Sequence, residues 1–191
     1  MVGCELLRYT EGPIATMRWA EEGADRERIS PQGHVAGFCA FIQTTLFRRE
    51  CLLELGAFDE ALHTCEDWEI TLRAVGKWDL GNVPQPLVMS YETAGSLSSV
   101  VARRSFALRH ILERHRALLA ADRRVHARLL CEISKADFHG GKAADARRTA
   151  LAALALAPLE PRAWVLWLGS FFGAEAVLRV ISANRRLRGR A

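Results

Sequence analysis

Two short acidic segments in the first half of the chain contain the residues best suited to acid–base chemistry. Residues 56–60 include Asp59 and Glu60, and residues 65–69 include Glu66 and Asp67. A carboxylate at the rim of a helix N-terminus can accept the proton of a substrate hydroxyl. Carboxylates at that position are also ordinary helix caps that complement the helix dipole. Their role therefore depends on the pattern of residues around them.

The second acidic segment predicts the start of a helix. Apolar residues recur at helical spacing after Glu66, and Gly76 predicts the end of the helix. The predicted apolar stripe consists of Trp68, Leu72 and Val75. Glu66 and Asp67 would then lie at the N-terminal rim, and we expect them to be exposed to a pocket and not buried.

The chain around these segments resembles the inverting, nucleotide-sugar-dependent glycosyltransferases of family 2, which have the GT-A fold. The resemblance covers residues 33–99, and its strength lies in the order of several pieces that are each weak alone. The pieces are QTTLFRRE (43–50), LGAFDE (55–60), EDWEITLR (66–73), VPQPLV (83–88), Tyr91 and GSLS (95–98).

The resemblance implies catalytic roles for the acidic pair. Asp67 would take the proton of the acceptor hydroxyl while that oxygen attacks the anomeric carbon and inverts it, and Glu66 would orient or tune Asp67. Three further residues are candidates for substrate binding. Trp68 either forms an apolar wall for a sugar ring or belongs to the core, and Arg73 either holds a diphosphate or is a solvated helix charge. Asp59 is the third candidate. Its alternative role is to fix the loop after Phe58 through local hydrogen bonds to the backbone, which needs no substrate.

The chain also departs from the family. A complete enzyme has an N-terminal nucleotide-binding half that ends in an Asp-X-Asp element, which binds Mn or Mg and the donor phosphates. This sequence contains no Asp-X-Asp, and Glu92, Thr93 and Ala94 follow Tyr91 where the family often has a metal-binding histidine. We therefore assign no metal ligands to the chain. We expect a donor-binding partner chain, a longer polypeptide or self-association to complete the site.

The fold that we expect is an α/β, partial GT-A domain in residues 1–99, followed by an all-α helical tail in residues 100–191. The net charge is −7 in residues 1–99 and +11 in residues 100–191, so the two regions differ in character. A basic region can face anionic lipid, nucleic acid or the acidic region of its own molecule. We do not expect nucleic acid as a partner, because the arginine-rich helices lack interleaved aromatic residues and a reading motif.

The first region is predicted to contain strands joined by helices. Residues 1–32 suggest one strand and a loop, and residues 34–45 suggest a buried strand or a close approach of the backbone to a ligand. Thr44 or Thr45 would cap a helix that runs to Leu55 and is stopped by Gly56. Residues 79–83 and 87–91 are two short strand candidates, with Pro84 and Pro86 fixing a turn between them.

The second region shows helical periodicity throughout. A first helix would carry Phe106, His110 and Leu118, and a second would carry Val125, Leu129 and Ile133 before Gly140 and Gly141. Residues 142–158 resemble the second helix of a tetratricopeptide-type repeat, which predicts one helical hairpin. Residues 164–181, with the arginines that follow, predict either an amphipathic helix at an anionic membrane surface or a final core helix.

Composition excludes several classes of protein. Half of the 191 residues are hydrophobic, which is enough for one sizeable core or two small ones. The five cysteines have no metal-ligand spacing and are odd in number, so neither a zinc site nor a disulfide framework is expected. No apolar run reaches the length of a membrane span and no leader is recognisable. We expect a cytoplasmic protein, either free or in contact with the inner face of the membrane.

Two functions remain open at the level of the sequence. One is a glycosyltransferase, as a fragment or truncated form, that makes cell-surface glycan or polysaccharide from a nucleotide sugar and a glycan or lipid-linked acceptor. The isolated chain would be inactive without a donor-binding half. The other is a non-catalytic relative that acts as a helical interaction module or at a membrane surface.

Overall fold

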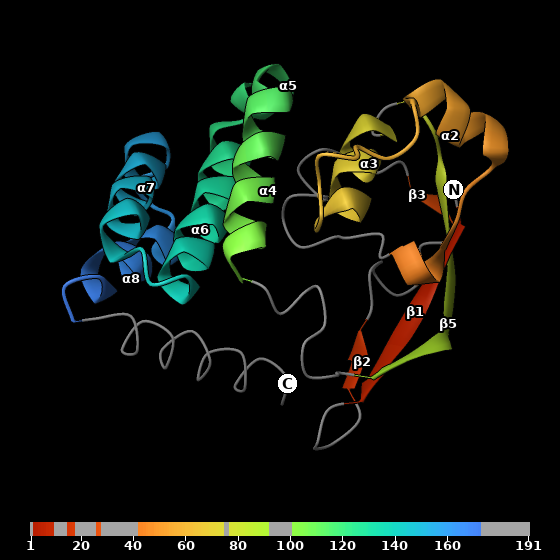
Figure 1. Ribbon diagram of the computed structural model, residues 1–191, viewed down its shortest axis with the longest axis horizontal. Coiled ribbons are helices and arrows are strands. Elements are labelled where there is room, and N and C mark those ends of the chain that lie inside the picture. Colours follow the sequence, from red (N-terminus) through yellow and green to blue (C-terminus); the bar gives the residue numbers. More distant parts are fainter. Residues whose placement is uncertain are drawn as a thin grey trace. The chain divides into compact units, whose positions relative to one another are not determined.

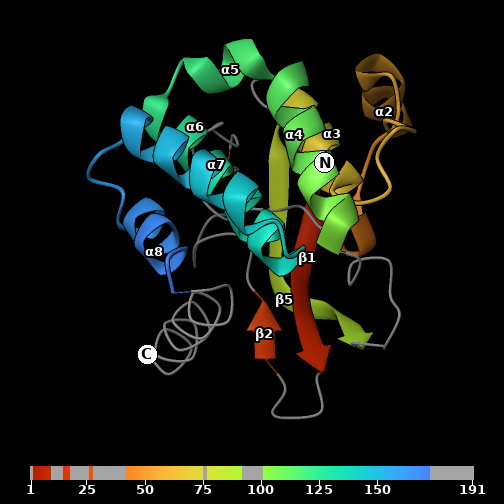
Figure 2. The same cartoon turned by 60° about the vertical axis from the view of Figure 1, so that its left-hand side comes forward.

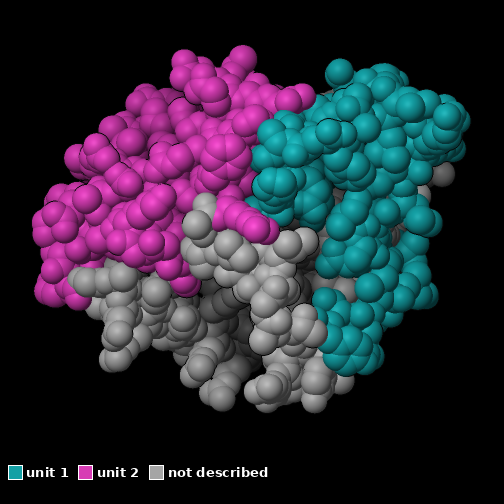
Figure 3. Space-filling model, viewed as in Figure 1, with its two compact units in different colours: residues 1–100 teal, residues 101–191 magenta. Residues whose placement is uncertain are grey.

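The chain folds into two compact units, Met1–Val100 and Val101–Ala191 (Figure 3). In this computed structural model, residues 2–9, 15–17, 26–27, 42–74, 77–91 and 101–172 are described. The division falls one residue from the boundary expected from the sequence. The first unit combines a sheet with helices, and the second is helical in its described residues.

A five-stranded sheet forms the first unit's framework in the described residues (Figure 1). Its central pair is parallel and joins β1 (Val2–Tyr9) to β5 (Leu80–Tyr91). β2 (Ala15–Met17) and β4 (Thr45–Leu46) pair with β1 in the antiparallel sense. β3 (Arg26–Glu27) pairs with the first residues of β5. The strand order is therefore β2-β1-β5-β3, with β4 on β1.

The prediction of two strands separated by a turn at Pro84 and Pro86 is wrong, because β5 runs through both prolines as one strand. Its register with β1 shifts at this point: Cys4 pairs with Val83, but Glu5 pairs with Pro86. Proline lacks the N–H that a regular ladder needs, and bulges are among the few places in a sheet where it is accepted. The prolines therefore mark an irregular stretch of pairing and not a turn.

The N-terminal segment holds more strands than predicted. β1 includes the apolar piece that suggested a strand, but β2 and β3 were expected to be loop. Strands of two or three residues are too short to show an alternating pattern, so hydrophobic periodicity does not predict them. Of the strand expected at 34–45, residues 34–41 lie outside the described residues. The rest forms a 3-10 turn, η1 (Ile42–Thr44), and then β4.

Two helices, α2 (Arg49–Leu55) and α3 (Glu66–Ala74), pack together in the first unit. The predicted cap at Thr44 or Thr45 is wrong, since Arg48 precedes α2 and makes no side-chain cap. Gly56 ends α2 as predicted: its φ of 78° is in the left-handed region that favours glycine. The helices share a buried core cluster made by Cys51, Leu55, Ile70 and Ala74.

The second unit consists of five helices in the described residues (Figures 1 and 2). They are α4 (Val101–Arg114), α5 (Arg116–Ala120), α6 (Arg123–His139), α7 (Ala143–Leu156) and α8 (Pro161–Gly169). α6 is central and contacts each of the other four. Both views show α7 beside α6, so these two form the predicted hairpin around the turn at Gly140.

The prediction for α6 is confirmed, whereas that for the preceding helix is wrong. Val125, Leu129 and Ile133 are buried on α6, which ends at His139. The single helix expected through Phe106, His110 and Leu118 is broken at His115 into α4 and α5, and Phe106 is 58% exposed. The buried face of α4 is instead formed by Ser105, Ala107, Leu108 and Ile111.

The apolar segment predicted at 164–181 is only partly described. α8 covers its first residues, and residues 173–181 lie outside the described part of the chain. Among the residues that the structure describes, no helix combines the length and the apolar character needed to cross a bilayer.

Candidate functional site

Asp67 occupies the second position of α3, where backbone N–H groups surround its carboxyl group. Oδ1 accepts a hydrogen bond from the Trp68 N–H at 2.7 Å. The Ile42 N–H, in η1, also acts on the carboxyl group, so a segment more than twenty residues earlier in the chain reaches the start of α3. The Thr71 hydroxyl donates to the Asp67 carbonyl oxygen at 2.7 Å and fixes the first turn. The carboxyl group is thus positioned by two separate segments of the first unit.

The surroundings of Asp67 raise the pKa of its carboxyl group. Burial is the main cause, and the neighbouring charge of Glu66 acts in the same direction. Hydrogen bonds from the N–H groups of Trp68 and Ile42 oppose the rise and are outweighed. Glu66 and Asp67 are both half-buried, so the expectation that they would be exposed holds only in part. A carboxylate with a raised pKa is a stronger base than an ordinary aspartate.

The residue before the helix adopts an unusual backbone conformation. Cys65 has a φ of 62°, which is costly for a residue with a side chain, and it is buried at 9% exposure. Its carbonyl oxygen nevertheless accepts the Glu69 N–H at 3.0 Å and begins the helix. Strain of this kind tends to occur next to functional groups. Here it sets the direction in which Glu66 and Asp67 leave the loop.

Arg73 and Glu69 form a buried ion pair that was not predicted from the sequence. The Arg73 Nε lies 3.0 and 2.9 Å from the two Glu69 carboxylate oxygens, and Nη2 lies 2.6 Å from Oε2. Nη1 donates to the Leu55 carbonyl oxygen at the end of α2. The Glu69 side chain is 0% exposed and that of Arg73 is 13% exposed. Glutamate four residues before arginine on a helix is a recognisable pairing signal, but it does not reveal burial.

This ion pair changes the interpretation of Arg73. The alternative of a solvated helix charge is wrong, because the guanidinium group is tied to Glu69 and to the end of α2. The alternative of a diphosphate ligand stays a prediction, and any such contact would use N–H groups beyond those in the described bonds. In the described residues, Arg73 joins α3 to α2 and thereby supports the helix that carries Asp67.

The other two substrate-binding candidates have different surroundings. Trp68 is half-buried, and the core cluster of α2 and α3 packs against Trp78 instead. Asp59 Oδ1 accepts the Ala61 N–H at 3.0 Å, which confirms its local turn role. A substrate contact of either residue stays a prediction. The structure brings Glu66, Asp67, Trp68 and Arg73 together on one helix, with Asp59 in the loop that precedes it.

A metal ion held by protein side chains alone needs several ligands close together. No group of three or more histidine, cysteine, aspartate or glutamate side chains among the described residues is arranged to hold one. The Mn or Mg implied for a complete family enzyme stays an expectation, with no ligands assigned to it in this part of the chain.

Comparison with known proteins gives no family for the chain. No protein-family model matches it, and no curated protein or solved structure matches it significantly.

Proposed function

We propose that the chain is the acceptor-side part of an inverting glycosyltransferase, with Asp67 as its general base. The observation that carries this proposal is the half-buried Asp67 carboxyl group, fixed at the start of α3 with its pKa raised by burial. The ordered family-like pieces in residues 33–99 add to it. The reaction would contribute to cell-surface glycan or polysaccharide synthesis.

The proposed step transfers a sugar from a nucleotide sugar to an acceptor hydroxyl on a glycan or a lipid-linked saccharide. The acceptor oxygen forms a bond to the anomeric carbon while the bond from that carbon to the diphosphate breaks. The proton of the hydroxyl passes to Asp67, and the nucleoside diphosphate leaves with the bonding electrons on the opposite face. Glu66 raises the basicity of Asp67 through its charge. The Glu69–Arg73 pair keeps the helix in place.

The donor-binding half would come from a longer polypeptide, from a partner chain or from a second copy of this one. An apolar row on β5 favours such a partner: Leu87, Met89 and Tyr91 are 63%, 48% and 61% exposed. Alternate residues of a strand share one face of the sheet, so these three side chains form a continuous apolar stripe. A stripe of this kind is a common docking surface.

The test measures nucleoside diphosphate release by tagged protein purified from its native cells together with any bound partners. Nucleotide sugars are supplied one at a time with a lipid-and-glycan extract from the same cells. We expect Asp67→Asn to lower the rate at least about 100-fold, the usual contribution of a general base. Asp79→Asn, which changes an exposed carboxylate of the same unit, is the matched control. Equal rates for the two variants, or no release from any nucleotide sugar, would refute the proposal.

The second candidate is a non-catalytic module that acts at a membrane surface, and exposed aromatic residues near α8 favour it. Trp164, Phe171 and Phe172 are 43%, 56% and 79% exposed in a unit with a strong positive charge. Aromatic side chains beside basic residues suit the interface of an anionic membrane. Co-sedimentation with vesicles of phosphatidylglycerol distinguishes the candidates, since Phe172→Ser would weaken it while Asp67→Asn would leave it unchanged.

A further inference from the structure

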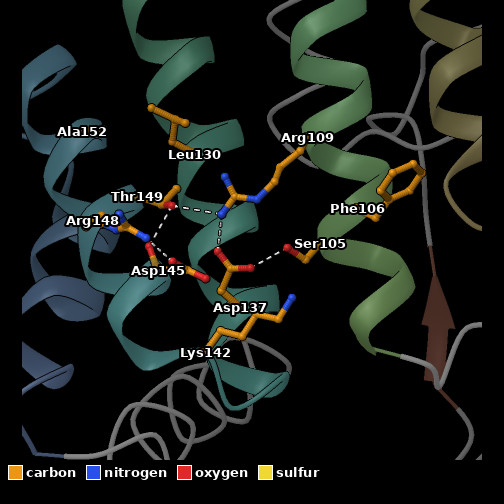
Figure 4. Close-up of a pocket in the computed structure, with 10 residues that line it drawn as sticks. All are labelled: Ser105, Phe106, Arg109, Leu130, Asp137, Lys142, Asp145, Arg148, Thr149 and Ala152. Carbon is orange, nitrogen blue, oxygen red and sulfur yellow. Dashed lines mark hydrogen bonds and ion pairs between the residues drawn. The ribbon is translucent and has the colours of Figure 1, made fainter.

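A pocket of about 520 Å³ lies within the helical unit, between α4, α6 and α7 (Figure 4). Its volume is in the range of small-molecule sites. Charged side chains from all three helices and from the turn before α7 line it: Arg109, Asp137, Lys142, Asp145 and Arg148. None of these residues belongs to the first unit.

A buried polar network fixes one wall of the pocket. The Asp137 side chain is 1% exposed and accepts hydrogen bonds from the Ser105 hydroxyl and from Arg109 Nη2, the latter at 2.5 Å. Arg109 Nη2 also lies 3.4 Å from the Thr149 hydroxyl oxygen. The Arg109 side chain is 48% exposed, so part of its guanidinium group faces the pocket while the rest is held. This wall is therefore preorganised before any ligand binds.

The opposite wall concentrates positive charge around one exposed carboxylate. Arg148 donates a hydrogen bond to Asp145, and this bond is the main cause of the lowered pKa of the Asp145 carboxyl group. The charges of Arg109 and Lys142 lower it further, so three cations act on the same point. The pocket is lined by three cationic side chains and two carboxylates, so its charged groups sum to one positive charge. The Lys142 ammonium group carries it, since it has no side-chain partner among the described residues.

One end of the pocket is apolar. Leu130 and Ala152 lie at the end opposite Lys142 in Figure 4. Leu130 precedes Asp137 by two helical turns on α6, which corresponds to about 10 Å along the axis. Asp145 and Ala152 have the same spacing on α7. The pocket thus offers a charged end and an apolar end separated by the length of a small organic molecule.

We infer that this pocket binds a small organic anion, with its carboxylate or phosphate group at Lys142 and Arg109 and its apolar part against Leu130 and Ala152. The ammonium and guanidinium groups would donate charge-assisted hydrogen bonds to the anion. The Asp145 carboxylate competes with the ligand for the same cations. The binding is predicted to strengthen when that carboxylate is neutralised.

The experiment titrates the full ¹⁵N-labelled chain with phenyl phosphate and follows backbone amide shifts and the dissociation constant. We expect saturable shifts at Ser105, Lys142 and Thr149. Lys142→Met should weaken binding about tenfold, which corresponds to one charge-assisted hydrogen bond. Lys77→Met, at an exposed lysine of the first unit, is the matched control and should bind as the wild type does. Asp145→Asn should bind more tightly, a result that mere loss of structure would not give.

Separate titrations identify the source of the anion. Inorganic phosphate tests the charge alone, phenol tests the ring alone, and vesicles of phosphatidic acid test a lipid headgroup. We expect weaker binding of inorganic phosphate and no shifts with phenol. The inference is overturned if phenyl phosphate gives no saturable shifts, or if inorganic phosphate binds equally tightly. It is also overturned if only the vesicles bind, or if Lys142→Met and Lys77→Met behave alike.

Discussion

The buried pair of Glu69 and Arg73 allows a quantitative prediction about the first unit. Replacing Arg73 with Met removes every contact of its guanidinium group but retains most of the side-chain volume. Glu69 would then be a carboxylate at 0% exposure without its counterion. Breaking a buried ion pair in this way costs about 3–5 kcal/mol in the free energy of unfolding. The Leu55 carbonyl oxygen also loses a donor, which places the expected cost within that range and not below it.

The double variant Glu69→Met/Arg73→Met should be more stable than Arg73→Met alone. It leaves no buried charge, and apolar replacements of buried ion pairs are often close to neutral. Its remaining cost is the unsatisfied Leu55 carbonyl oxygen, about 1–2 kcal/mol. The predicted sign is therefore unusual, since a second substitution restores stability that the first removed.

Urea unfolding at 25 °C, followed by tryptophan fluorescence, measures these free energies. The substitutions Trp164→Phe and Trp167→Phe silence the helical unit, so that Trp19, Trp68 and Trp78 report the first unit alone. Arg49→Met, at an exposed arginine of α2, is the matched control and should change the free energy of unfolding by less than about 0.5 kcal/mol.

Two results would contradict this reasoning. A cost below about 1 kcal/mol for Arg73→Met would mean that Glu69 is hydrated or protonated when Arg73 is removed. A double variant less stable than Arg73→Met would mean that the contacts of the Glu69 side chain, and not its charge, hold α3 against α2.

Three further predictions concern single residues. Asp67→Asn should raise the free energy of unfolding at pH 7. Because folding raises the Asp67 pKa, ionisation of this carboxyl group lowers the stability as the pH rises from the unfolded to the folded pKa, and asparagine does not ionise. Urea unfolding over a range of pH should therefore show that the variant's advantage disappears below both pKa values. Asp122→Ala should lower the free energy of unfolding of the helical unit by about 1 kcal/mol, measured with urea. The Asp122 Oδ1 accepts hydrogen bonds from the N–H groups of Arg124 and Val125, at 2.8 and 3.1 Å, and thereby caps α6. Asp122→Asn keeps an acceptor oxygen and should cost little. Burial raises the pKa of the Cys131 thiol to about 12, so mass spectrometry should find it unalkylated by iodoacetamide at pH 8 in the native protein and alkylated after denaturation.

Elements with strong periodicity or explicit stop signals could be predicted from the sequence. Val125, Leu129 and Ile133 lie one above another on a helix, and only a buried stripe explains that spacing. The end of α2 at Gly56 could also be predicted, because glycine, which lacks a Cβ, is the usual residue in the left-handed conformation that ends a helix. The start of α3 at Glu66 followed from the acidic first turn. In each case a local rule and the tertiary structure agree.

Features that depend on tertiary pairing could not be predicted in the same way. The continuity of β5 through Pro84 and Pro86 depends on β1, whose register shift accommodates the prolines. The break at His115 separates two segments whose sequence pattern is compatible with one helix. For the candidate site, the sequence located Asp67 but not its half-burial, and the four-residue spacing of Glu69 and Arg73 gave no indication that their ion pair is buried. The pocket at Lys142 required three helices to be placed together.

The parallel pairing of β1 with β5 has a consequence for how the chain acquires its structure. The α6–α7 hairpin closes a turn of a few residues, and such local contacts form in microseconds to milliseconds. β1 must instead wait for a partner that follows it by 70 residues. During synthesis at about 5–20 residues per second, that interval lasts about 4–14 s. Throughout it, the backbone of β1 is without its parallel partner strand. Chaperones that shield nascent chains should therefore be needed most at the N-terminal strand, well before the helical unit is made.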